Sequence, residues 1–231
     1  SLAQVTGSSL DLETILPQAL NSILDSLEFE AGFISLFDPQ SGQLQLAATH
    51  GIPATMTGQL QGILNQNTIR DYIAHQHIPM LIEDLSKQTP LITRLQAGAP
   101  QLYEHLLGWG IHTYIGTPLV QQGQVLGMIG MFARQARLLS SNDQALQVTL
   151  VQHLATAITN TRLFQAVTDE RSRLQALIES SSDGIIFIDT NQKVPIINAA
   201  ALRFLDLPVV PQEWINRTTL DFLSILRQCA P

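Results

Sequence analysis

Cysteine and long hydrophobic runs are what this sequence most clearly lacks. Cys229 is the only cysteine among 231 residues, so an internal disulfide and a multi-cysteine zinc site are both excluded. No apolar run approaches the roughly 20 residues that a membrane-spanning helix needs, and no secretory signal pattern opens the chain. We therefore expect no membrane span and a cytoplasmic protein.

Charged residues are also scarce. They make up 13% of the chain, about half the usual quarter, and 12 basic against 19 acidic residues give a net charge of −7. Neither a basic run nor a basic–aromatic stripe is present, so we expect no direct nucleic-acid partner. Hydrophobic residues reach 45%, enough for a core, and the length fits about one and a half to two domains.

Helical and strand-like patterns alternate through the first part of the chain. Turn residues at 38–42 separate the first two strands, and the turn at 121–124 separates the last two. The expected elements, in chain order, are a helix over 10–28, strands over 31–37 and 44–48, helices over 55–65 and 67–76, a short strand over 79–82, an irregular or helical stretch over 90–108, and strands over 113–120 and 125–133.

One helix of unusual length follows these elements. Ser141 and Gln144 have the Ser-x-x-Gln form of a capping box, and helical spacing then continues to about Ser180 without glycine or proline. A helix of roughly 37 residues is about 55 Å long, which is more than a globular domain needs. We therefore expect residues 143–180 to form a signalling helix that connects two domains.

Apolar residues recur along this helix at alternating steps of three and four. This apolar seam consists of Leu146, Leu150, Ala157, Phe164, Val167, Leu174 and Ile178. Three polar residues, His153, Asn160 and Arg171, interrupt it. Because an apolar seam on a helix that leaves a domain needs a partner, we predict a parallel homodimer through residues 143–180.

A second group of elements follows the long helix. It consists, in order, of an apolar strand over 185–188, a polar turn over 189–192, a short strand over 194–197 and a helical run over 199–207. This order resembles the opening of a PAS sensory domain, including Asn198 as the cap of its first internal helix. The resemblance implies that residues 181–231 are the N-terminal, incomplete part of a PAS domain, with an output domain C-terminal to this segment.

The earlier elements resemble a GAF domain over residues 1–165. The motifs that carry the resemblance are Leu36-Phe37-Asp38, Ile82-Glu83-Asp84-Leu85, Thr117-Pro118-Leu119-Val120 and Val125-Leu126-Gly127-Met128-Ile129-Gly130. The implied fold is α+β: an antiparallel sheet flanked by helices, a long connecting helix and a partial PAS-like α/β segment. The implied function is the sensory region of a bacterial signal-transduction protein, with a sensor histidine kinase as the leading parent. A diguanylate cyclase or a transcriptional activator remains the alternative parent.

The resemblance also implies a pocket for an unidentified small-molecule ligand over one face of the sheet. The candidate ligand-binding residues are Phe33, Ser35, His50, Asp84, Trp109, Tyr114, Thr117 and Met128. Each has a simpler role open to it, as a core residue, as an exposed strand end for His50, or as a helix cap for Asp84. No catalytic residue is assigned, because no nucleophile–base pair, phosphate-binding glycine loop or paired catalytic carboxylates can be identified. A GAF domain without ligand, serving as a dimerisation and spacer module, is the alternative function.

Individual residues argue against two ligand classes of the GAF family. Gly98 stands where the bilin-attaching cysteine of phytochromes would be and Leu102 where its neighbouring histidine would be, so a covalent bilin is not expected. The cyclic-nucleotide signature ends in Phe, three residues, Asp and Glu, whereas here Leu139, Asp143 and Gln144 occupy those positions. Cyclic nucleotides are therefore disfavoured, and the cofactor is left unassigned.

The histidines do not predict a metal centre. His75 and His77 form a His-x-His pair, but two imidazoles are too few for a closed zinc site unless Glu83 or Asp84 joins them. No metal site is expected.

Overall fold

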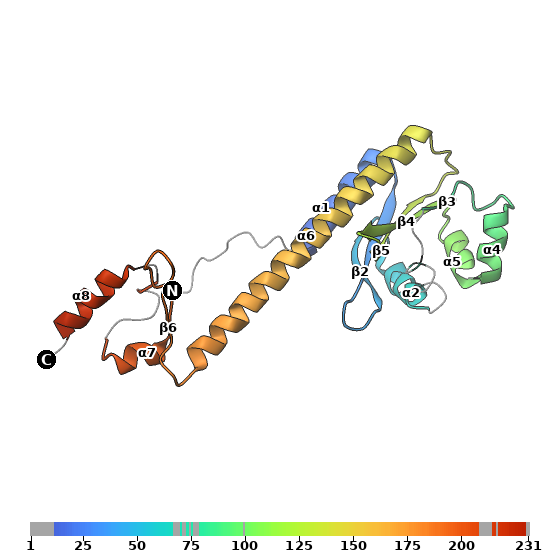
Figure 1. Ribbon diagram of the computed structural model, residues 1–231. Helices are drawn as coiled ribbons and strands as arrows, with labels where there is room; N and C mark the ends of the chain where they lie inside the picture. Colours follow the sequence, from blue (N-terminus) through green and yellow to red (C-terminus); the bar gives the residue numbers. More distant parts are fainter. Residues whose placement is uncertain are drawn as a thin grey trace. The chain divides into compact units, whose positions relative to one another are not determined.

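The computed structural model describes residues 12–66, 70, 73, 75, 79–98, 100–207, 214, 215 and 217–229. The chain divides into two compact units, residues 1–163 and 164–231. One continuous helix, α6 (Ser141–Ser180), begins in the first unit and ends in the second (Figure 1).

The first unit is built on a five-stranded antiparallel sheet with the strand order β2-β1-β5-β4-β3 (Figure 1). The strands are β1 (Ala31–Phe37), β2 (Leu44–His50), β3 (Met80–Ile82), β4 (Thr113–Gln121) and β5 (Gln124–Ala133). Gln122 and Gly123 join β4 to β5 with φ values of 50° and 79°, and a two-residue type I′ turn needs positive φ at both positions. The sheet and its flanking helices confirm the expected α+β class.

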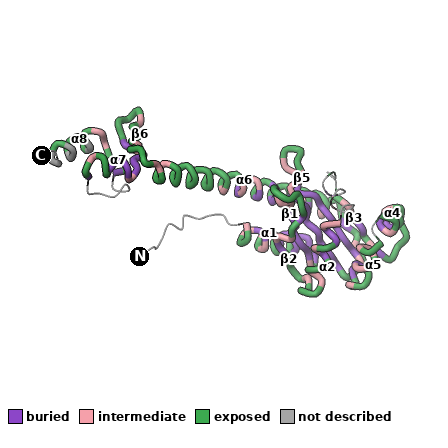
Figure 2. The backbone as a smooth tube through the Cα atoms, turned by 90° about the horizontal axis from the view of Figure 1, so that it is seen from below, coloured by how far each residue is buried: buried purple, intermediate pink, exposed green. Residues whose placement is uncertain are grey.

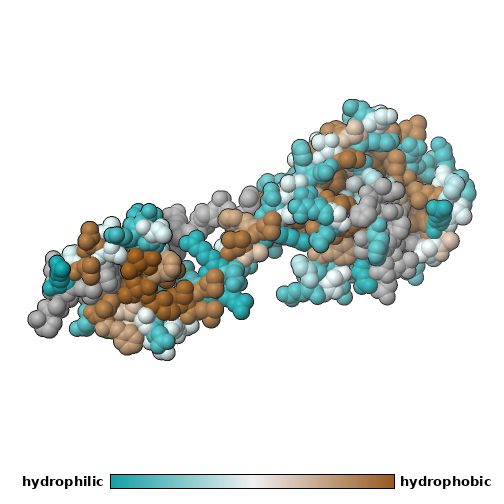
Figure 3. Space-filling view, viewed as in Figure 1, coloured by the Kyte–Doolittle hydropathy of each residue, from teal (hydrophilic) through white to brown (hydrophobic). Residues whose placement is uncertain are grey.

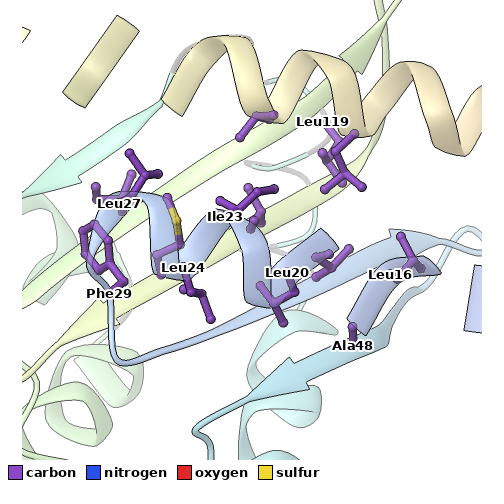
Figure 4. Close-up of a cluster of buried hydrophobic side chains, with 14 of the residues drawn as sticks. Leu16, Leu20, Ile23, Leu24, Leu27, Phe29, Ala48 and Leu119 are labelled. Carbon is purple, nitrogen blue, oxygen red and sulfur yellow. The ribbon is translucent and has the colours of Figure 1, made fainter. Parts of the chain in front are cut away.

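One face of the sheet is covered by α1 (Leu12–Leu27) and the first part of α6 (Figure 1). The apolar stripe of α1 packs on alternate residues of the strands, which point to this face because side chains in a strand alternate. Figure 4 shows this cluster, with Leu16, Leu20, Ile23, Leu24 and Leu27 on the helix. The buried residues of α6 all lie between Gln147 and Thr161, and the later turns of the helix are exposed (Figure 2).

The capping of α6 differs from the expected capping box by one residue. Asp143 Oδ2 accepts a hydrogen bond from the backbone N–H of Ser140 at 3.1 Å, and Ser140 Oγ accepts one from the N–H of Asp143 at 3.1 Å. The box is therefore formed by Ser140 and Asp143. The expected pair, Ser141 and Gln144, does not form it, since Gln144 Nε2 donates to the carbonyl of Leu139 at 3.4 Å.

The opposite face of the sheet lies under three shorter helices, α2 (Ala54–Leu64), α4 (Pro90–Gly98) and α5 (Pro100–Gly108). The expected helix over 67–76 lies largely outside the described residues, and the stretch 90–108 forms the last two of these helices.

A side chain of α2 completes the free edge of β2. Gln61 Nε2 donates to the carbonyl of Leu44 at 2.6 Å, and Gln61 Oε1 accepts from the N–H of Leu46 at 2.8 Å. The amide thus satisfies the outward-facing backbone groups of an edge strand, which would otherwise be open to pairing with another chain. The same two bonds fix α2 over the sheet face that carries the candidate site.

The second unit contains β6 (Ile186–Phe187), β7 (Ile196–Ile197), α7 (Ala199–Phe204) and α8 (Thr219–Cys229). Both strands are shorter than the segments 185–188 and 194–197 that the sequence indicates. A small core lies beneath them, formed by Val194, Ile197, Ala201, Leu202, Leu207 and Trp214. Several large apolar side chains of this unit remain exposed (Figure 3), among them Ile186, Phe187, Ile188 and Phe204.

Candidate ligand-binding site

A cavity of about 290 Å³ lies on the face of the sheet opposite α1 and α6. Its floor comes from the strands, namely from Phe33, Tyr114, Gly116, Pro118, Met128 and Phe132. Its walls come from the shorter helices and from β3, with Leu60, Ile63 and Leu64 of α2, Met80 of β3, Leu91, Arg94, Leu95 and Gly98 of α4, and Leu102 and Leu106 of α5. Ile73 completes the lining among the described residues.

The floor depends on two glycines that leave room for aromatic rings. A Cβ on Gly130 would lie 2.2 Å from Cε1 of Phe33, and a Cβ on Gly116 would lie 2.6 Å from the hydroxyl oxygen of Tyr114. The Phe33 ring therefore lies over Gly130, its partner in β5, and the Tyr114 hydroxyl lies over Gly116, two residues later in the same strand. Each ring contacts Phe132, at centroid distances of 5.7 Å and 5.3 Å, so the floor is aromatic.

Three of the eight residues that the sequence indicates are brought together at the cavity. Phe33, Tyr114 and Met128 all line it. Ser35 lies two residues after Phe33 in β1, so it faces the same side of the sheet, and it is completely buried. It does not line the cavity, and its Oγ makes no hydrogen bond with any described residue.

Thr117 lies on the face of the sheet opposite the cavity. Tyr114 and Thr117 are three positions apart in one strand, and strand side chains alternate, so the two cannot share a face. Gly116 and Pro118, on either side of Thr117, line the cavity instead. The Thr117 hydroxyl accepts a hydrogen bond from Nε2 of Gln147 on α6.

His50 and Trp109 also lie away from the cavity. His50 is exposed at the end of β2, and it does not line the cavity. Trp109 lines a separate hollow of only about 30 Å³, next to Ile52 and Arg134. The Trp109 ring meets His105 edge to face, with the centroids 5.8 Å apart. For His50, the structure matches the simpler role of an exposed strand end.

Asp84 shapes a turn and does not line the cavity. Its Oδ1 accepts hydrogen bonds from the backbone N–H of Ser86 at 3.0 Å and from the Ser86 hydroxyl at 2.6 Å. Nδ1 of His112 and Nζ of Lys87 each lie 3.7 Å from the carboxylate. The hydrogen bonds from Ser86 are the main cause of a pKa below the ordinary 3.8 for Asp84. The carboxylate therefore remains ionised in the loop after β3.

Among the lining residues that the sequence analysis did not name as candidates, Arg94 is the charged one. Arg94 shares one face of α4 with Leu91, Leu95 and Gly98, and their helical spacing is visible in the sequence. To assign this face to the cavity, however, one must know that 90–98 is a helix and which of its sides meets the sheet. Gly98 and Leu102, considered only as positions of a missing bilin attachment, both line the cavity.

The described part of the chain contains neither a cluster of metal-ligating side chains nor a helix that could cross a membrane. Within it, no three histidine, cysteine, aspartate or glutamate side chains gather closely enough to hold a metal ion, and His77 lies outside the described residues. No helix of that part has the length and apolar character needed to cross a membrane.

The first unit is thus an antiparallel sheet with α1 and α6 on one face and a lined cavity on the other. Residues 9–159 match the family model described as GAF domain, and residues 172–228 match the one described as PAS fold. The chain therefore belongs to the GAF domain family and carries a PAS segment after it, as its motifs predict. Domains of both kinds are sensory and not catalytic, so this chain is a signal-transduction sensory region.

Known proteins with similar folds include several bacterial sensory domains. A domain of a putative two-component sensor histidine kinase from Sinorhizobium meliloti covers 68% of this chain and 97% of its own, with a TM-score of 0.53 and 16% identity. The GAF domain/HD domain protein from Geobacter sulfurreducens covers 70% and 99%, with a TM-score of 0.54 and 16% identity. At such identities these structures support the fold alone.

One curated protein is similar in sequence over most of this chain. A Nif-specific regulatory protein from Herbaspirillum seropedicae is 26% identical over 175 residues, which is 75% of this chain. The chain spans 30% of the length of that curated relative.

Proposed function

We propose that the first unit binds a small, non-covalent ligand in the cavity and that α6, paired with a second copy of itself, carries the response toward an output domain. The mechanism is a population shift: a ligand held better by one conformation of the cavity changes how α6 packs on the sheet. The location we propose for this region is the cytoplasm.

The observation that carries this proposal is the position of Thr117 within β4. Gly116 and Pro118 line the cavity on one face of the strand, while Thr117 between them contacts Gln147 of α6 on the other. Gln147 is 3% exposed, so this contact is shielded from water. A ligand that displaces β4 at Gly116 or Pro118 therefore acts directly on a buried contact of the helix.

A second contact ties α6 to the strand that carries Phe33. Nη2 of Arg162 donates to the carbonyl of Phe37, the last residue of β1, at 3.1 Å. Burial lowers the pKa of the Arg162 guanidinium, and the nearby carboxylate of Asp38 opposes that effect. Phe37 packs against the apolar cluster that surrounds the cavity. The helix α6 is thus hydrogen-bonded to two strands of the cavity floor, β4 and β1.

The later turns of α6 supply the proposed dimer contact. Phe164, Val167 and Leu174 are 56%, 68% and 51% exposed, which leaves a large apolar area without cover in this chain. The contact we propose excludes the start of the apolar seam, because Leu146 and Leu150 pack against the core of the first unit. The exposed part of the seam begins near His153.

We propose two alternative classes for the parent protein. The domain order that the sequence resembles is typical of a sensor histidine kinase, and we retain that as one form. The other form is a diguanylate cyclase or a transcriptional activator, and the similarity to a Nif-specific regulatory protein over 75% of the chain supports a regulatory parent. A GAF domain that holds no ligand and acts only as a dimerisation spacer is the competing function.

A thermal-shift screen of small metabolites against the dimer tests the ligand. We expect a saturable stabilisation that Leu102→Trp abolishes, since this larger side chain fills the cavity. Leu107→Trp is the matched control, because Leu107 neighbours the cavity wall on α5 yet is 40% exposed and does not line it. If no compound shifts the melting temperature and no small molecule copurifies, the spacer function replaces the proposal.

Hydrogen exchange of α6 tests the transmission. With the ligand found by the screen, amides of residues 143–161 should change their exchange rates in the native protein and not in Thr117→Val, which removes the hydroxyl contact. Thr149→Val is the control, because the Thr149 hydroxyl bonds only the carbonyl of Ala145 within the helix. Equal responses in native protein and Thr117→Val would exclude this route.

A further inference from the structure

The cavity contains one charge in an otherwise apolar lining. Among the described residues that line it, Arg94 alone carries a formal charge. Arg94 lies in α4, one turn after Leu91 and one turn before Gly98, so all three share the helix face that meets the cavity. Arg94 is exposed and also lines the cavity, so we infer that its guanidinium lies at the cavity mouth.

This guanidinium has no structural partner in the described part of the chain. Arg94 takes part in none of the ion pairs or hydrogen bonds found there. Arg137 shows what a structural arginine looks like in this fold: it bonds the carbonyls of Leu27 and Glu28 and pairs with the Glu28 carboxylate at 3.1 Å. Unlike Arg137, Arg94 makes no contact of this kind that would stabilise the fold among the described residues.

The space next to Arg94 is open. A Cβ placed on Gly98, four residues later on the same face, would meet no other atom within 4 Å. A ligand group at this point of the mouth would therefore reach the guanidinium without displacing a side chain of the wall.

The volume sets the size of the apolar part of a ligand. An engineered apolar cavity of about 150 Å³ holds one benzene molecule, so the 290 Å³ of this cavity fits a body of about two rings. Aromatic floor residues such as Phe33 and Tyr114 offer flat faces to such a body.

We propose that the cavity selects a monoanion with an apolar body of about two rings, whose carboxylate pairs with Arg94 at the mouth. The inference rests on the proposed function, because it names the ligand class of the same cavity. Arginine remains charged at any physiological pH and presents its donors in a planar fork that suits a carboxylate. A neutral ligand of the same shape would leave that fork unused, and a cation would be repelled by it.

Calorimetric titration with 2-naphthoate and with its neutral amide, 2-naphthamide, tests the proposal on the whole chain. We expect naphthoate to bind about tenfold or more tightly than naphthamide, because a charge-assisted hydrogen bond is replaced by a weaker one. Arg94→Gln should remove that difference, and Arg94→Lys should keep part of it. Arg134→Gln is the matched control, since Arg134 is exposed and lines only the separate small hollow.

The remaining outcomes overturn the inference in ways that separate it from the proposed function. If both compounds bind equally and Arg94→Gln changes neither affinity, the cavity binds apolar ligands without regard to charge. That result is consistent with the proposed function and refutes the selectivity for an anion. If neither compound binds, the ligand class is wrong, and the metabolite screen with Leu102→Trp decides the proposed function on its own. Thermal melting of each variant establishes that it is folded, which we expect because Arg94 has no partner to lose among the described residues.

Discussion

The side-chain amide of Asn198 donates a hydrogen bond to the backbone carbonyl of Ile178, in the last turns of α6, at 2.9 Å. The same amide donates to the carbonyl of Asp183 at 2.9 Å, while Asn198 Oδ1 accepts from the N–H groups of Ile185 and Ala201, also at 2.9 Å. One fully buried side chain therefore joins the end of α6 to the segment before β6 and to the N-terminus of α7.

Replacing Asn198 with alanine should disorder the second unit while the first unit stays folded. The substitution removes four hydrogen bonds, of which the one from the Ala201 N–H is buried and the other three are partly buried. An unpaired buried group costs about 1–3 kcal/mol, and the cap of α7 is also lost. Hydrogen exchange should rise over residues 185–204 and not in β4. Asn191→Ala, in the exposed turn, is the control. Unchanged protection of α7 in Asn198→Ala would show that this network does not hold the unit together.

Gly130→Ala should destabilise the first unit by about 1–3 kcal/mol, the usual result of overpacking a core. Its Cβ would lie 2.2 Å from the Phe33 ring, which then has to move into the cavity. Gly62→Ala is the control, because Gly62 lies in α2 with nothing within 4 Å of a new Cβ. That change should stabilise by up to about 1 kcal/mol, since alanine favours a helix. Chemical denaturation measures both, and equal effects would contradict the close packing of the floor.

Phe164→Asp should weaken the predicted parallel dimer by tenfold or more. A carboxylate at the apolar seam would have to be buried against its copy in the second chain, which is costly both for its charge and for its lost apolar area. Val148→Asp is the matched control: Val148 is 48% exposed on α6 but lies off the seam. Light scattering over a concentration series gives the dissociation constant. A native protein that remains monomeric at the highest concentration would refute the dimer itself.

Stability should fall steeply in acid, and Asp143 should account for part of the fall. Hydrogen bonds from the side chain and backbone of Ser140 lower the pKa of Asp143 below its ordinary 3.8. A lowered pKa in the folded state means that the stabilisation is complete above pH 3.8 and is lost as the pH falls through the lower value. Asp38, Asp84 and Asp221 have lowered pKa values for the same kind of reason and act in the same direction.

The measurement is denaturant unfolding at several pH values between 7 and the acid range. Asp143→Asn should lower stability at neutral pH and flatten the acid dependence relative to the native chain. Asp169→Asn, which alters an exposed carboxylate later in α6, should leave the pH profile unchanged. An Asp143→Asn profile parallel to the native one would show that its capping role does not depend on ionisation.

Local periodicity was enough to predict most of the fold. The strands β1, β2, β4 and β5 and the length of α6 each depend on neighbouring residues, and the sequence contains that information directly. The capping role of Asn198 was expected from the resemblance to a PAS domain, and the structure confirms it. The alternation of strand side chains also shows that Tyr114 and Thr117 face opposite sides of the sheet. Choosing both as ligand-binding candidates from the motifs did not take this alternation into account.

Only the tertiary structure decided which residues form the cavity and which of them carries charge. The lining comes from three short helices and four strands that lie far apart in the sequence, so no local pattern brings Phe33, Gly98 and Tyr114 together. The role of Arg94 depends on the orientation of α4 against the sheet, and that of Thr117 on where α6 crosses β4. Sequence determined the elements because their formation is local. Packing determined the site because a cavity is what remains between side chains of distant segments once their apolar faces have met.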